Sequence, residues 1–159
     1  MQASIRRCLF PTRGFALAIG FALAICAADA RAIFIVNQPW IRPAAQGRST
    51  EAYMDLTSTE GAVLVGARSE IAAVSIVAPG KAARSVRKLS LPAQAMVSLA
   101  PGAYRLLLSK LARSLKRGDR VLMTLTIEAA DGSRQDIAVD AEARMRSPIE
   151  DERRAHGAH

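Results

Sequence analysis

Short runs in which apolar and polar residues alternate recur along most of the chain. One run places Ala52, Met54 and Leu56 on one face, and a later run places Val121, Met123, Leu125 and Ile127 on one face. A period of two is typical of β-strands that bury one side. Further apolar runs span residues 62–67, 73–78, 86–91 and 95–99. The pattern predicts many short strands.

Turn residues separate these runs. Asp131-Gly132 predicts a tight hairpin turn into a strand with Ile137 and Val139 on one face. Pro101-Gly102 precedes a strand in which Leu106 and Leu108 share a face with Tyr104. Segment 109–116 could form one helical turn, but no helical period is sustained there. Short strands at this spacing predict an all-β fold, a single-domain β-sandwich over residues 33–140.

The two ends of the chain differ from this domain. Residues 141–159 are charged and almost free of large apolar side chains, which predicts a disordered tail. The N-terminus has the three parts of a secretory signal peptide, which predicts an exported, periplasmic protein. These parts are cations at Arg6, Arg7 and Arg13, an apolar run over 15–28, and small-residue cleavage sites after Ala30 or Ala32.

The two cysteines, Cys8 and Cys26, both fall in this leader. Leu23–Cys26 is similar to a lipobox, but Ile25 replaces the small residue expected before a lipidated cysteine, which argues against a lipoprotein. Cleavage after Ala30 leaves no disulfide and no thiol. It also lowers the formal charge from +8 to +6, because three cations and one acid are removed. The sequence does not indicate an oligomeric state.

The composition excludes several functions. The only histidines are His156 and His159, so no Ser–His or Cys–His nucleophile pair can form within the domain. No Gly-rich phosphate loop is present, and the protein is predicted not to be an enzyme. Scattered charge and few aromatics argue against nucleic acid as a partner. The basic charge favours an anionic surface or simple solubility.

Two blocks carry a resemblance to a known family. They are PWIRPAAQGRSTEAYMDLTS, from Pro39, and LSLPAQAMVSLAPGAYRLLLSKLARSLKRGDRVLMTLTIE, from Leu89. Their ordered motifs resemble the PCu(A)C family of periplasmic copper chaperones from about Pro39 to Val139. The resemblance implies a Greek-key, cupredoxin-like β-sandwich that binds copper and acts in copper handling or oxidase assembly.

The resemblance also implies where Cu(I) ligands would fall. The family holds Cu(I) with a His, a Met and a His-x-Met pair, and soft thioethers with imidazole suit that ion. In this sequence the first His position falls near Val77 and the Met position around Ala82–Arg84. The His-x-Met pair falls on Arg105 and Leu107. We therefore expect the domain to have lost the family's Cu(I) site and to have no firmly assigned cofactor, with copper retained only as what the resemblance implies.

Arg105 allows two interpretations. It is a solvated cation on the outer face of its strand, or it belongs to an anion- or partner-binding patch with Arg84, Arg87 and Lys88.

Three functions follow. The first is a non-enzymatic binding protein of the copper-chaperone family that has lost its Cu(I) site. The second is a copper carrier that uses His156 and His159 in the tail. The third is an anion- or membrane-surface-binding module that uses the basic loop and Arg105.

Overall fold

The computed structural model describes residues 33–80, 82 and 84–156. The expected signal peptide, both cysteines, the cleavage sites and His159 lie outside the described residues. Within the described part, no helix has the length and apolar character needed to cross a membrane.

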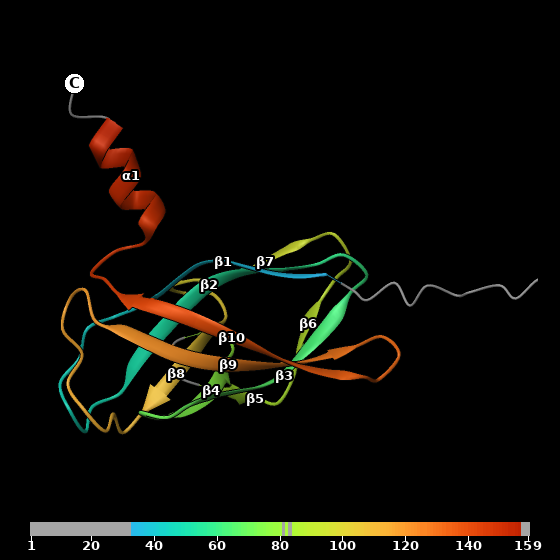
Figure 1. The fold of residues 1–159 in the computed structure, drawn as a ribbon, viewed down its shortest axis with the longest axis horizontal. Coiled ribbons are helices and arrows are strands. Elements are labelled where there is room, and N and C mark those ends of the chain that lie inside the picture. Colours follow the sequence, from blue (N-terminus) through green and yellow to red (C-terminus); the bar gives the residue numbers. More distant parts are fainter. Residues whose placement is uncertain (1–32, 81, 83, 157–159) are drawn as a thin grey trace, which may run out of the picture. The chain divides into compact units, whose positions relative to one another are not determined.

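Ten strands and one helix make up the described chain (Figure 1). The strands are β1 (Phe34–Ile41), β2 (Thr50–Ser58), β3 (Ala62–Ser69), β4 (Ala73–Val77), β5 (Ser85–Val86), β6 (Leu89–Leu91), β7 (Met96–Leu99), β8 (Arg105–Ser109), β9 (Arg120–Ala129) and β10 (Arg134–Ala143). The helix is α1 (Pro148–His156).

The strands form one sheet that bends over itself into a nearly closed barrel or sandwich. Its order is β5-β4-β8-β2-β1-β10-β9-β3-β6, and β7 also pairs with β2. The β1–β10 pair is parallel and the other strand pairs are antiparallel. Figure 1 shows β9 and β10 (orange) as a long hairpin, with β4, β5 and β8 grouped in another part of the sheet. The all-β fold class is confirmed.

The main core lies inside this curved sheet and follows the alternation of the sequence. Ala52, Met54 and Leu56 of β2 are at most 2% exposed, as are Leu106 and Leu108 of β8. The β9 residues predicted to face inward, Val121, Met123, Leu125 and Ile127, are also buried. Burial of this much hydrocarbon is the main force that holds the sheet closed.

The β9–β10 hairpin turns where Asp131-Gly132 predicted it. Gly132 has a φ of 81°, which a residue without a Cβ adopts at no steric cost. The Asp131 carboxylate accepts hydrogen bonds from the backbone N–H and the hydroxyl of Ser133. Two other local expectations differ from the structure. Segment 109–116 contains no helical turn, and run 86–91 is divided between β5 and β6.

The C-terminal boundary was placed three residues too early, because β10 continues past Asp140 to Ala143. Ala141 and Ala143 are fully buried, and the small size of alanine hides this from a search for large apolar residues. Residues 148–156 form α1, where a disordered tail was expected. The Ser147 hydroxyl caps the helix by accepting from the N–H of Glu150, 3.2 Å away. Ser147-Pro148-Ile149-Glu150 is a capping-box pattern that the sequence analysis missed.

Candidate functional site: the covered face of β2, β8 and β4

The strand register brings a set of unusual side chains onto one face of the sheet, opposite to the main core. Val77 of β4 pairs with Arg105 of β8, Leu107 of β8 pairs with Glu51 of β2, and Tyr53 of β2 pairs with Trp40 of β1. Paired residues of antiparallel strands point to the same side. We call Trp40, Glu51, Tyr53, Val77 and Arg105 the covered face.

These side chains are shielded from water although they are not part of the main core. Val77 is 0% exposed, Tyr53 1% and Trp40 5%. None of the three belongs to the hydrophobic core cluster that contains their strand neighbours Ala52, Ile76 and Leu106. The sheet therefore buries both of its sides at this point, which a period of two does not predict.

Arg105 is not the solvated outer-face cation that the alternation predicted. Its side chain is 11% exposed, and its Nε donates to Oε1 of Glu51 at 2.7 Å. Its Nη1 also lies 3.3 Å from the carbonyl oxygen of Ala78 and 3.4 Å from that of Ala103. Two turns, one after β4 and one before β8, thus place carbonyl acceptors around the guanidinium. A buried guanidinium needs such partners, since it cannot lose its charge.

An aromatic pair extends this cluster. The Tyr53 hydroxyl donates a hydrogen bond to Oε2 of Glu51, so Glu51 binds Arg105 through one oxygen and Tyr53 through the other. Burial and the Glu51 carboxylate raise the pKa of Tyr53 well above its usual value. The rings of Trp40 and Tyr53 lie 4.5 Å apart, tilted by 37°, and the Arg42 guanidinium carbon lies 5.7 Å from the centre of the Tyr53 ring.

The positions that the resemblance assigns to copper ligands are neighbours in space. Val77 and Arg105 are paired, and Leu107 follows on the same face of β8. The turn after β4 returns to them, because the Ala78 N–H donates to the carbonyl oxygen of Arg84 at 2.9 Å. Val77 and Leu107 have hydrocarbon side chains, and a guanidinium has no lone pair for a metal. The side-chain oxygens of Glu51 and Tyr53 on this face are hard donors, and they already bind each other and, through Glu51, Arg105.

The other residues of the predicted anion patch have different environments from that of Arg105. Arg84 and Arg87 are exposed. Lys88 pairs with Glu128 of β9 at 3.3 Å, and Arg134 pairs with the same carboxylate at 2.9 Å. These cations hold the pKa of Glu128 below its usual value, with Arg134 contributing most. Arg105 and Lys88 are therefore bound to different acids, and a shared anion site of the four cations stays a prediction.

His156 is the one predicted tail ligand among the described residues. It is exposed at the end of α1, with its Nδ1 2.9 Å from the carbonyl oxygen of Glu152. Within the described part of the chain, no group of three or more His, Cys, Asp or Glu side chains is arranged to hold a metal ion. A metal site with His159 stays a prediction.

The sequence analysis missed Glu51, the central residue of the covered face. Alternation does place Glu51 and Tyr53 on one side of their strand, two residues apart. The register that sets this side of β2 against the Arg105 side of β8 is a property of the tertiary structure, so no local signal marked Glu51.

Comparison with known proteins shows one family model that matches the sequence and several solved structures with a similar fold. The family model described as "Putative lipoprotein LpqE-like" matches residues 35–141. No curated protein matches the chain by sequence. A solved structure titled "Apo PCuAC domain from PmoF1" is 25% identical, with a TM-score of 0.60 over 70% of this chain and 92% of that one.

Two further solved structures are similar. The solution structure of Cu(I)-bound DR1885 from Deinococcus radiodurans is 27% identical, with a TM-score of 0.53 over 74% of this chain and 85% of that one. The copper-bound PCuAC domain of PmoF2 is 23% identical, with a TM-score of 0.58 over 70% and 92% of the two chains, a likeness of fold. The expected resemblance to copper-chaperone domains of the PCu(A)C type is confirmed.

Proposed function

Because the chain belongs to the LpqE-like family and has a PCuAC-like copper-chaperone domain, we propose that it is an exported, non-enzymatic binding protein of copper handling that does not hold Cu(I) at the family's position. The observation that carries this proposal is the ion pair between Arg105 and Glu51, which lies where the resemblance puts the metal ligands.

The chemistry of the covered face supports the loss of Cu(I) binding at that place. Cu(I) prefers thioether, thiolate and imidazole ligands. The positions assigned to ligands instead carry Val77, Arg105 and Leu107, and a fixed positive charge at Arg105 repels a cation. Cu(I) would also have to displace a guanidinium that has three oxygen partners.

The same arrangement supports a binding role. The Arg105–Glu51 pair links β8 to β2, and the Trp40–Tyr53 stack links β2 to β1. This part of the domain is therefore held together by its own side chains and presents a formed surface. We propose that this surface binds a protein of copper handling or oxidase assembly, by analogy with the family. Export rests on the N-terminal leader pattern and is supported by the word "lipoprotein" in the family's description.

A competitive Cu(I) titration tests this proposal. The purified protein is titrated anaerobically with Cu(I) in the presence of a strong chromophoric Cu(I) chelator. We expect the wild-type protein to leave the Cu(I) with the chelator. A variant with three of the four ligands restored, Val77→His with Arg105→His and Leu107→Met, and with Glu51→Gln, is expected to take up Cu(I). In that variant Glu51→Gln removes the carboxylate that would otherwise lose its partner.

The histidine tail provides the control. If the wild-type protein withdraws Cu(I) and a His156→Ala, His159→Ala variant does not, the tail carries copper and the second sequence-based function replaces the proposal. If both proteins withdraw one equivalent of Cu(I), the domain holds the ion and the assignment of the ligand positions is wrong.

A further inference from the structure

A pocket of about 470 Å³ lies at the end of the sheet where β10 ends. It is lined by Arg117, Glu142, Arg144, Met145, Arg146 and Asp151. These residues come from the turn before β9, the end of β10, the connection to α1 and the first turn of α1. Pockets of this size are large enough for a small organic ligand.

Backbone hydrogen bonds hold the sheet side of this pocket in place. The Gly118 N–H donates to the carbonyl oxygen of Ala143 at 2.8 Å, and the Ala143 N–H donates back to that of Asp119 at 2.7 Å. The Asp119 carboxylate closes the turn by accepting from the N–H of Lys116 at 2.9 Å. Arg117 therefore projects from a turn that is fixed to the end of β10, next to Arg144 in the chain that follows.

The pocket has more arginines than carboxylates, and only one of the arginines is paired with an acid of the described chain. Arg144 binds Glu142 at 2.7 Å and lies 3.8 Å from Asp151, so the two lining carboxylates both face one cation. Arg117 and Arg146 are exposed and have no acidic partner among the described residues. Three guanidiniums thus face two carboxylates, and two of the three guanidiniums are available to a ligand.

We propose that this pocket binds a phosphate group through Arg117 and Arg146, and that Arg144 forms part of the pocket wall behind the phosphate. Guanidinium groups bind phosphate oxygens with two parallel hydrogen bonds, which favours arginine over lysine at such sites. The exposed side chain of Met145 offers an apolar contact to the rest of the ligand. The phosphate belongs to a small soluble molecule or to a lipid headgroup, and the pocket recognises the phosphate group that both carry.

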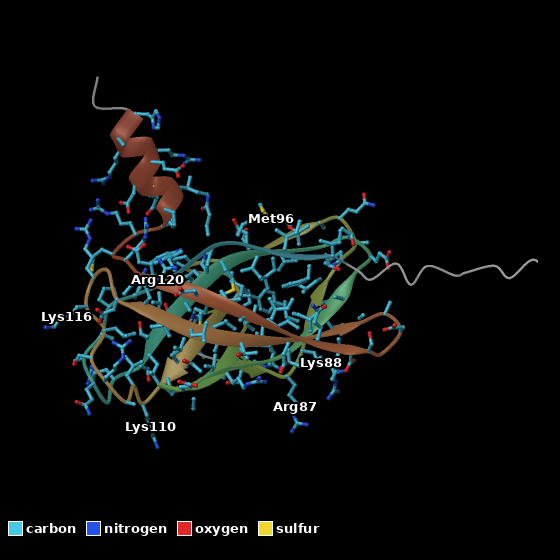
Figure 2. The ribbon with its side chains drawn as sticks, viewed as in Figure 1. Arg87, Lys88, Met96, Lys110, Lys116 and Arg120 are labelled. Carbon is cyan, nitrogen blue, oxygen red and sulfur yellow. The ribbon has the colours of Figure 1, made fainter. Side chains whose placement is uncertain are left out.

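The surrounding surface supports an anionic ligand at this end. Lys116 points outward from the turn that also carries Arg117 (Figure 2), whereas Arg120, at the start of β9, is bound to Asp140 at 2.8 Å. The cations of the sequence-based patch, Arg87 and Lys88, are labelled on a different part of the domain in the same view. The two sets of cations can therefore be tested separately.

The test measures binding of inorganic phosphate, at constant ionic strength, and of phosphatidylglycerol vesicles, with phosphatidylcholine vesicles as the uncharged control. The full chain is compared with an Arg117→Ala, Arg146→Ala variant and with the matched control Arg68→Ala, Arg134→Ala, which removes the same charge from two exposed arginines outside both candidate sites. We expect saturable binding that weakens by about tenfold or more in the first variant and stays within about twofold in the control, since only the first loses guanidinium contacts to the phosphate.

Asp151→Asn sharpens the test, because it removes a carboxylate from the pocket and leaves all three arginines in place. It is expected to tighten binding. Saturation by inorganic phosphate identifies a soluble ligand, and saturation by phosphatidylglycerol vesicles alone identifies a lipid headgroup. Equal losses in the two double variants would mean general charge attraction and would overturn the site, as would the absence of saturable binding to either probe. The Cu(I) titration does not depend on these arginines, so the two proposals fail independently.

Discussion

The inner side of β2 and β8 is buried and the outer side is largely covered, but by different chemistry. On the inner side, Ala52, Leu106 and Leu108 belong to the hydrophobic core cluster, and the buried Thr50 opposite Leu108 is a polar exception. On the outer side, Glu51, Tyr53 and Arg105 form a chain of hydrogen bonds and ionic contacts that turns and aromatic rings cover. The free energy of apolar burial scales with the area removed from water, whichever apolar groups cover it. A covered polar cluster is favourable only when every member has a partner. The inner side thus maintains the fold, whereas the stability of the outer side depends on each polar partner being present.

The largest expected effect tests the inner side. Leu106→Ala should lower the free energy of unfolding by about 2–5 kcal/mol, because the side chain is fully buried and leaves a cavity. Its neighbour Leu107 points to the other side and is partly exposed, so Leu107→Ala should cost less than about 1 kcal/mol. Denaturant unfolding measures both. Similar losses for the two variants would contradict the assignment of the two sides.

The second prediction tests the covered ion pair. Arg105→Met should cost about 1–3 kcal/mol, because it leaves the Glu51 carboxylate in a shielded position without its cation. The lower part of that range is expected, since the Glu51 side chain is 31% exposed and water can reach it. Adding Glu51→Gln should recover part of the loss, and the double-mutant cycle measures the coupling.

An exposed ion pair serves as the control for this cycle. Arg68 and Asp136 are 2.8 Å apart, close to the 2.7 Å of the covered pair, but their side chains are 64% and 47% exposed. Arg68→Met should change the free energy of unfolding by no more than about 0.5 kcal/mol, as is usual for surface pairs. If Arg105→Met were equally mild, the covered face would be open to solvent.

The third prediction concerns a single hydroxyl. Tyr53→Phe keeps the ring against Trp40 and removes the hydrogen bond to Glu51, which should cost about 0.5–1.5 kcal/mol. Trp40 is the only tryptophan of the chain, so its fluorescence reports on this cluster. We expect a change in Trp40 emission with Tyr53→Phe and none with Tyr104→Phe, whose hydroxyl has no hydrogen-bond partner in the described residues. If Tyr53→Phe changes neither the Trp40 emission nor the free energy of unfolding, the Tyr53 hydroxyl does not contribute to the cluster.

The sequence by itself determined the class of fold, the family and most of the main core. The alternation in β2, β8 and β9 is a local property, because each strand shows its buried side as every second residue. The β9–β10 turn was equally local, since Asp131 and Gly132 have the backbone preferences that this turn needs. The helix α1 could also have been predicted from its capping pattern at Ser147.

The environment of Arg105 was decided only by the tertiary structure. Its partner Glu51 is 54 residues away in the chain, and the carbonyl oxygens of Ala78 and Ala103 come from two separate turns. The pocket beside β10 has the same origin, because Arg117 and Arg146 are brought together by the pairing of the turn before β9 with Ala143. A period of two states which side of a strand a residue occupies, but not whether loops cover that side or which distant charge meets it there.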